Sequence, residues 1–131
     1  MKYLLDTNVC IYFMKGKFNL DEKFDSLDPD SLYISEITLA ELKFGVANSQ
    51  APEKNANALE KFIKGVNILP ILDALDIYAS EKTRLKKSGQ PIDDFDLLIG
   101  ASAIANELVL VTNNEKHFKR LGQIQIQNWV K

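Results

Sequence analysis

Cysteine and histidine are nearly missing from this chain, which contains one of each, Cys10 and His117. A single cysteine excludes an internal disulfide and cannot by itself make a thiolate zinc site. A single histidine excludes a mechanism based on paired histidines. A nucleophilic Cys10–His117 pair would have to join two distant segments, and Cys10 lies among apolar neighbours, so the sequence does not favour it either.

Long apolar runs and nucleotide-type glycine motifs are also missing. No run approaches the length of a membrane span, and Met1-Lys2 lead directly into a predicted strand without a signal-peptide leader. We therefore expect a cytoplasmic protein. The absence of a Gly-x-Ser-x-Gly elbow and of a phosphate-cradling glycine loop excludes two further common catalytic designs.

The chain also lacks an excess of basic residues, since 16 Lys and Arg face 18 Asp and Glu for a net charge of −2. Binding to nucleic acid would therefore depend on local basic clusters. Candidates are 15–17, 82–87 and 116–120, although such clusters are more often solvated helix faces.

What the chain does contain is enough apolar sequence, 46% of 131 residues, for one core, and we expect a single domain over residues 1–131. Strands are predicted within 2–8 and at 32–34, 67–72, 108–111 and 124–127. Helices are predicted at 7–15, 21–27, 36–48, 52–66, 73–87, 94–106 and 115–121. Strands that alternate with helices predict an α/β fold with a mostly parallel sheet covered on both faces.

Two predicted strands end in similar polar triplets, Asp6-Thr7-Asn8 and Thr112-Asn113-Asn114. In open α/β sheets, sites form at the carboxyl ends of strands. The match suggests neighbouring strands that frame one crevice. Asn114 can offer a carbonyl oxygen to a cation or hold a water, although capping of the helix that follows explains it equally well.

Glu41 and Asp96 are the best candidate partners of Asp6. Glu41 lies on a predicted helix that is apolar almost all round, where a carboxylate must be protonated, paired or bound to a cation. A salt bridge to lysine, or a side chain that reaches solvent, is the structural alternative. Asp96 lies in the first turn of its helix, where the dipole favours a carboxylate. The small residues Gly100 and Ala103 below it leave room for a ligand or a close backbone.

If Asp6, Glu41 and Asp96 converge, they form an anionic site that contains only oxygen ligands. Such a site suits Mg²⁺ or Mn²⁺, because hard cations prefer carboxylates and water. A cation of this kind usually serves phosphate chemistry, so the residues suggest a metal-dependent phosphodiesterase.

Taken together, these segments closely resemble the PIN-domain family, and within it the VapC ribonuclease toxins of bacterial toxin–antitoxin systems. The resemblance covers almost the whole chain in order, and the segments that carry it are Leu4–Asn8, Ser35–Leu42, Phe44–Gly45, Pro91–Ile92, Asp96–Ala101, Leu110–Asn114 and Asn128–Trp129. It implies a three-layer α/β/α sandwich with a central parallel sheet of four or five strands. It also implies Mg²⁺- or Mn²⁺-dependent cleavage of RNA, often tRNA, inhibition by a VapB-type antitoxin whose tail enters the active-site groove, and a homodimer.

By position, the resemblance makes Asp6, Glu41 and Asp96 the catalytic and metal-binding acids. We expect Thr112 and Asn114 to position water or the Asp6 carboxylate. We expect Asn8 to brace the strand end through its amide.

One position departs from the family pattern, because PIN domains often carry a fourth acid where this chain has Asn114. The amide lowers the charge of the site and puts tight binding of a second metal in doubt. Glu115 would replace the missing acid only if the turn allows it, and Asp94 is a further reserve.

Two other functions remain open from the sequence. A phosphatase of the haloacid-dehalogenase type would use Asp6 as nucleophile but would need a second aspartate where this chain has Asn8. A non-catalytic PIN-like domain that binds RNA or protein is favoured only by Asn114.

Overall fold

Five short parallel strands form the central sheet of the protein, whose computed structural model describes residues 1–131. They are β1 (Tyr3–Leu5), β2 (Leu32–Ser35), β3 (Asn67–Leu69), β4 (Val109–Val111) and β5 (Gln125–Gln127). Their order across the sheet is β3-β2-β1-β4-β5, and every neighbouring pair is parallel. The predicted parallel sheet is confirmed, and β3 lies at an edge, which is where a strand followed directly by a proline such as Pro70 is tolerated.

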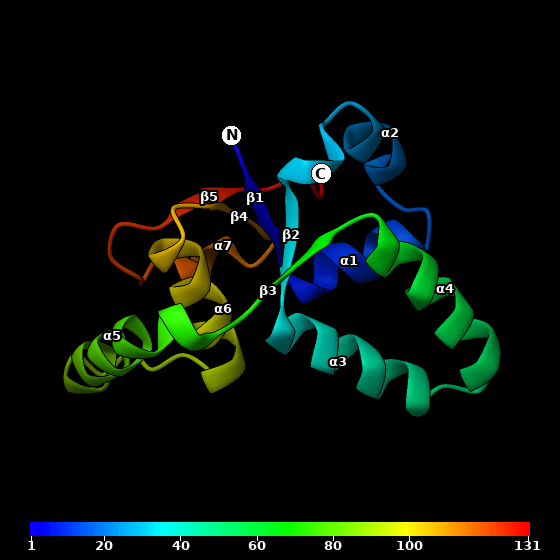
Figure 1. The fold of residues 1–131 in the computed structure, drawn as a ribbon. Coiled ribbons are helices and arrows are strands. Elements are labelled where there is room, and N and C mark those ends of the chain that lie inside the picture. The colour runs from blue at the N-terminus through cyan, green and yellow to red at the C-terminus, as the bar shows by residue number, and fades with distance from the viewer.

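Helices flank the sheet on both sides (Figure 1). The helices α1 to α4 (Thr7–Met14, Leu20–Asp25, Glu36–Ala47 and Pro52–Lys64) share one side, and α5 to α7 (Leu75–Lys87, Asp94–Ala105 and Glu115–Phe118) lie on the other. Two short 3₁₀ helices, η1 (Pro29–Ser31) and η2 (Leu72–Ala74), precede β2 and α5. None of the helices is both long and apolar enough to cross a membrane.

The two central strands divide their side chains between two separate cores. Leu4 and Leu110 belong to the core under α5, α6 and α7, whereas Leu5 and Val111 belong to the core under α1 to α4. Successive side chains of a strand point to opposite faces of a sheet, so one short apolar strand serves both cores. The three-layer α/β/α sandwich that the sequence predicted is therefore confirmed.

Several predicted boundaries differ from the structure. Asp6 is the N-cap of α1, because its carboxylate accepts a hydrogen bond from the Thr7 amide. The helix predicted to begin at residue 73 begins at Leu75, since Asp73 lies inside η2. The strand predicted to end at residue 72 ends at Leu69, because Pro70 has no amide proton with which to continue the ladder.

The strand order places β1 and β4 side by side at the centre of the sheet. From β1 the chain adds β2 and β3 towards one edge, and then β4 and β5 towards the other. The Asp6 amide donates to the Val111 carbonyl at 2.9 Å, so the two strands end together. The order in which strands are added therefore changes direction between β1 and β4. In open α/β sheets this change of direction opens a crevice at the carboxyl ends of the strands, where ligands bind.

Candidate active site

Asp6 lies buried at the end of β1, with both carboxylate oxygens held in place. Its Oδ1 accepts the Thr7 amide at 2.8 Å, and its Oδ2 accepts the Thr112 hydroxyl at 2.8 Å. Burial raises the pKa of the Asp6 carboxyl above its ordinary value, and the bonds from Thr112 and Thr7 act in the opposite direction. The carboxylate is thus fixed but poorly solvated.

Thr112 connects Asp6 to the turn that follows β4. Its hydroxyl oxygen also accepts the Asn114 amide proton at 2.9 Å, which fixes the start of α7 relative to Asp6. The Asn114 side-chain amide lies 2.9 Å from Nδ1 of His117 and does not cap α7. Capping therefore does not explain the asparagine at this position.

Asp96 lies half-buried in the first turn of α6. Burial is the largest cause that raises the pKa of this carboxyl to about 6, followed by the negative charges of Asp6, Asp93 and Glu41. The positive end of a helix dipole would lower it, so desolvation and neighbouring acids outweigh the helix terminus here. Asp6, Glu41 and Asp96, which the sequence could only list as candidates, are close enough to influence one another.

The surroundings of Glu41 differ from the prediction. We expected an apolar environment all round α3, but Ala40, Lys43 and Phe44 are exposed and Glu41 itself is half-buried. Apolar residues on every side of α3 do not bury the whole helix, because no other element packs against its outer face. The Glu41 carboxylate is fixed instead by the Thr7 hydroxyl, 2.7 Å from its Oε1.

The small residues of α6 do not leave room for a ligand. A Cβ placed on Gly100 would lie 2.3 Å from Leu121 Cδ1 and 3.3 Å from Phe118 Cδ1. Gly100 therefore lets α7 and the residues after it pack closely against α6.

Thr7 and Thr38 are site residues that the sequence reasoning missed. The Thr7 hydroxyl lies 3.1 Å from the hydroxyl of Thr38, which is fully buried on α3. One signal was present, because Thr38 precedes Glu41 by three residues and so shares its helix face. Asn8 does not act as the predicted brace, since its side chain is exposed and forms no hydrogen bond with the end of β1.

The two reserve acids are engaged elsewhere. Asp94 accepts hydrogen bonds from Lys82 at 2.8 Å and from the Tyr78 hydroxyl at 2.9 Å, and these bonds lower the pKa of its carboxyl. Glu115 accepts the Asn128 side-chain amide at 3.1 Å, which links α7 to the C-terminal segment. Neither carboxylate takes the place of a fourth acid.

Cys10 and His117 do not form a nucleophilic pair. Cys10 is fully buried on α1, and burial together with the charge of Asp6 raises the pKa of its thiol well above the ordinary value. The thiol therefore stays protonated and belongs to the core. His117 is exposed, and its Nδ1 contacts Asn114.

The donor set of the acidic cluster fits a hard divalent cation. The groups that could bind one are carboxylate oxygens, whose mutual repulsion a cation would relieve. No three acidic, histidine or cysteine side chains lie close enough to enclose an ion by themselves. Mg²⁺ is usually held by one or two carboxylates, with water and substrate phosphate as its remaining ligands, so a closed cage is not required.

Comparisons with known proteins relate the whole chain to one family. The PIN domain family model matches residues 3–124. The chain is 34% identical to the tRNA(fMet)-specific endonuclease VapC of Shigella flexneri, with 98% of each chain covered. It is 39% identical to Ribonuclease VapC1 of Haemophilus influenzae strain R2866, with both chains covered completely. The structure of DNA-bound VapBC from Salmonella typhimurium contains a similar chain, with a TM-score of 0.91, 35% identity and 98% of each chain covered.

Proposed function

Because this chain belongs to the PIN-domain family, and within it to the VapC ribonucleases, we propose that residues 1–131 form one domain that cuts RNA with the help of Mg²⁺ or Mn²⁺. The observation that carries the proposal is that Thr7 hydrogen-bonds to both Asp6 and Glu41 beside the ends of β1 and β4, where the charges of these two acids act on Asp96. The names of relatives make a tRNA the first substrate to test.

Asp6 and Asp96 would hold the cation, with Glu41 contacting it directly or through water. When bound, the ion would neutralise the phosphate and supply a reactive water. Thr112 and the Thr7 amide hold the Asp6 carboxylate in a single orientation. The second oxygen of Glu41 has no hydrogen bond within the protein, so it is free to orient water for in-line attack on phosphorus.

The position of the nucleophile determines the products. Attack by water leaves a 5′-phosphate and a 3′-hydroxyl, whereas attack by the ribose 2′-hydroxyl leaves a 2′,3′-cyclic phosphate. The site has no histidine pair to activate a 2′-hydroxyl. End-group analysis of the cleaved RNA should therefore find 5′-phosphates, and cyclic phosphate ends would contradict this mechanism.

Asp6→Asn is the decisive variant. It should abolish cleavage of purified RNA while the thermal unfolding midpoint stays the same or rises, because the neutral amide keeps the N-cap and removes a poorly solvated charge. The assay compares wild type and variant, free of any antitoxin, on total RNA and on tRNA with Mg²⁺, Mn²⁺ or EDTA.

The matched control is Asp21→Asn, which removes an exposed acid from α2, an element that contributes none of the three clustered acids. It should cleave like wild type. Cleavage by Asp6→Asn at the normal rate, or wild-type cleavage that is unaffected by EDTA, would refute the proposed role of the cluster.

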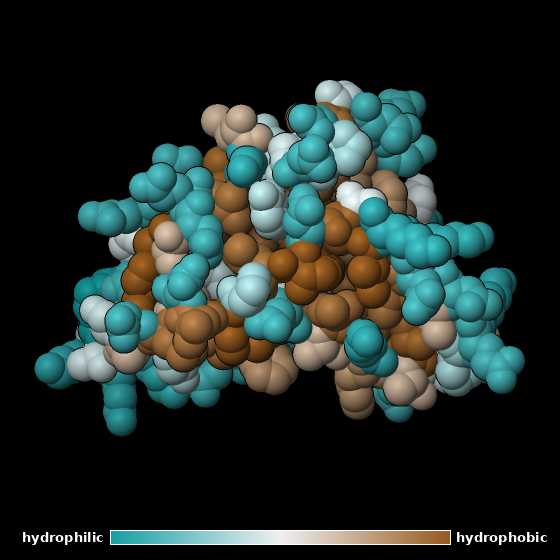
Figure 2. Space-filling model, viewed as in Figure 1, coloured by the Kyte–Doolittle hydropathy of each residue, from teal (hydrophilic) through white to brown (hydrophobic).

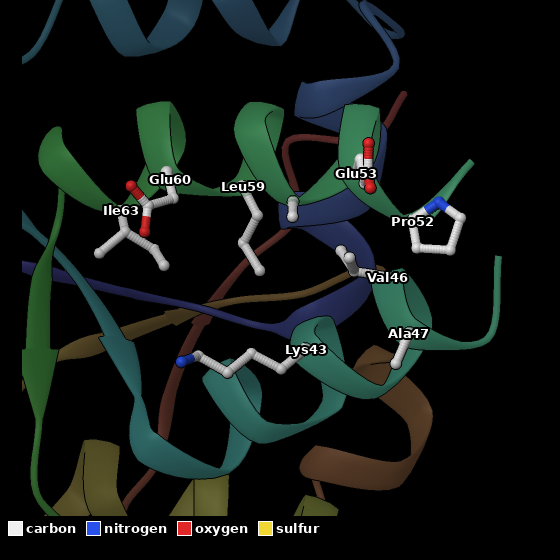
Figure 3. A pocket seen from close by; sticks show the side chains of 9 residues that line it. Lys43, Val46, Ala47, Pro52, Glu53, Leu59, Glu60 and Ile63 are labelled. Carbon is white, nitrogen blue, oxygen red and sulfur yellow. The ribbon is translucent and has the colours of Figure 1, made fainter.

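We also propose that a VapB-type antitoxin binds beside this site, in the cytoplasm where the RNA is found. Solved relatives are VapBC complexes. Two cavities border α3. One of about 400 Å³ lies between α3 and α4 and is lined by Leu59 and Ile63 of α4 and by Val46 of α3 (Figure 3). The other, about 420 Å³, is lined by both apolar residues and Glu41. A peptide in this second cavity would lie against Glu41 and could block RNA directly.

A further inference from the structure

One residue, Thr7, contacts both Asp6 and Glu41. Its backbone amide donates to Asp6 Oδ1 at 2.8 Å, and its hydroxyl lies 2.7 Å from Glu41 Oε1. Asp6 follows β1 and Glu41 belongs to α3, so these carboxylates come from elements separated by more than thirty residues of sequence. Thr7 therefore links the two acids through hydrogen bonds across the space between β1 and α3.

The direction of the hydrogen bonds follows from counting protons. The Thr7 hydroxyl donates to Glu41 Oε1, so its single proton points to Glu41. The Thr7 oxygen must then accept the proton of Thr38, whose oxygen is 3.1 Å away. Either hydroxyl can donate or accept, and only this direction satisfies both threonines and the carboxylate.

The position of Thr38 supports this order. Its side chain is 0% exposed, so water cannot replace its partner, and the structure gives its hydroxyl no hydrogen bond except that with Thr7. Thr7 is also buried. These two hydroxyls have only each other and Glu41 as partners, so they hold one arrangement, because breaking it would leave a buried polar group unpaired.

From these contacts we infer that Thr7 is the positioning residue that sets Asp6 and Glu41 for a shared divalent cation, and that Thr38 fixes the direction of the Thr7 hydrogen bond. The inference rests on the proposed function. This hydrogen-bond relay from Thr38 through Thr7 to Glu41 occupies Glu41 Oε1 and leaves Oε2 for the cation or its water. Partners that orient metal ligands typically change metal affinity about 10- to 100-fold when removed.

The test measures Mn²⁺ binding by calorimetry in the absence of RNA, together with thermal unfolding in EDTA. Thr7→Val keeps the shape of the side chain and should weaken Mn²⁺ binding about 10- to 100-fold, whereas Thr7→Ser, which keeps the hydroxyl, should stay within about threefold of wild type. Thr38→Val should weaken binding less, and Thr38→Ser should behave like wild type.

The double variant Thr7→Val/Thr38→Val separates the effect on Mn²⁺ binding from the effect on stability. Thr7→Val alone leaves the buried Thr38 hydroxyl unpaired, which lowers the unfolding midpoint. Adding Thr38→Val removes that hydroxyl and should recover part of the midpoint, while Mn²⁺ binding stays as weak as in Thr7→Val. Because Thr38 acts only through Thr7, the two effects on binding should not add.

Two results would overturn the inference, and they are distinguishable. If wild type binds Mn²⁺ and Thr7→Val binds it equally well, the relay is wrong and the proposed function stands. If wild type binds no Mn²⁺, the proposed metal site fails and the relay fails with it. Should Thr7→Val not fold, Thr38→Val decides by the same measurement, since an unchanged affinity there overturns the role of Thr38.

Discussion

At the scale of single residues, Asp96 links the chemistry of the site to stability. Its pKa is raised from 3.8 to about 6 by burial and by neighbouring acids. Between these values the folded protein binds a proton that the unfolded chain has released, so ionising Asp96 as the pH rises lowers the free energy of unfolding. The stability contributed by protonated Asp96 is therefore present at low pH and is lost as the pH rises towards about 6.

Asp96→Asn should consequently gain stability relative to wild type as the pH increases from about 4 to about 7. Denaturant unfolding of both proteins in EDTA at several pH values measures the difference. Added Mg²⁺ should reduce it, because a cation stabilises the ionised cluster.

Asp94→Asn is the control with the opposite sign. Hydrogen bonds from Lys82 and Tyr78 lower the pKa of Asp94, so its contribution is present above the ordinary carboxyl pKa and disappears as the pH falls. This variant should lose stability relative to wild type at neutral pH, by a small and salt-sensitive amount because the pair is exposed. A pH-independent difference between Asp96→Asn and wild type would contradict the electrostatic account.

At the scale of elements, two helical glycines allow a direct comparison. An added Cβ at Gly100 on α6 would press on Leu121 and Phe118, both buried, whereas at Gly45 on α3 it would meet nothing within 4 Å. Gly100→Ala should destabilise the protein by about 1–3 kcal/mol, because overpacking forces side chains or backbone to move.

Gly45→Ala should instead stabilise the protein by about 0.5–1 kcal/mol, since alanine favours a helix. Chemical denaturation measures both. The Gly100 variant should also reduce RNA cleavage, because moving α7 moves Asn114 relative to Thr112 and Asp6. Equal stability changes at the two positions would show that α6 and α7 are less tightly packed than the structure indicates.

At the scale of the whole molecule, exposed apolar side chains suggest where a second copy binds. Phe44 on α3 is 70% exposed, Leu72 in η2 is 75% exposed, and Phe95 on α6 is 48% exposed. Figure 2 shows apolar surface over the start of α5 and over the region around β3. Exposed apolar surface often marks an interface, and the family resemblance implies a homodimer.

We therefore expect a dimer in sedimentation equilibrium at micromolar concentration, and a monomer for the double variant Phe44→Asp/Leu72→Asp. Replacing exposed apolar side chains by acids leaves the monomer folded but disfavours burial of that surface. Phe18→Asp is the control, since Phe18 is also exposed, at 44%, but lies between α1 and α2 and not on α3 or η2. A wild-type monomer, or a dimer that tolerates both charges, would contradict this interface.

Much of the architecture was determined by the sequence alone. Short apolar runs that alternate with helical patterns specify parallel strands with crossovers, and the triplets after Leu5 and Val111 marked two strands that do end together. These features could be predicted because apolar periodicity, helix caps and proline act over only a few neighbouring residues. The candidate acids could also be named, since a carboxylate in an apolar segment requires a partner.

Only the tertiary structure decided how those acids are held. Thr7 and Glu41 are 34 positions apart in sequence, and Thr112 and Asp6 are 106 positions apart. Contacts over such separations produce no periodic sequence pattern from which they could be predicted. The same holds for the exposed outer face of α3 and for the close packing at Gly100, which depend on what else is near in space. The sequence alone identified the carboxylates, because the free-energy cost of burying a charged group can be judged from the residue type. The orientation of the carboxylates depends on hydroxyl groups that only folding brings within hydrogen-bonding distance.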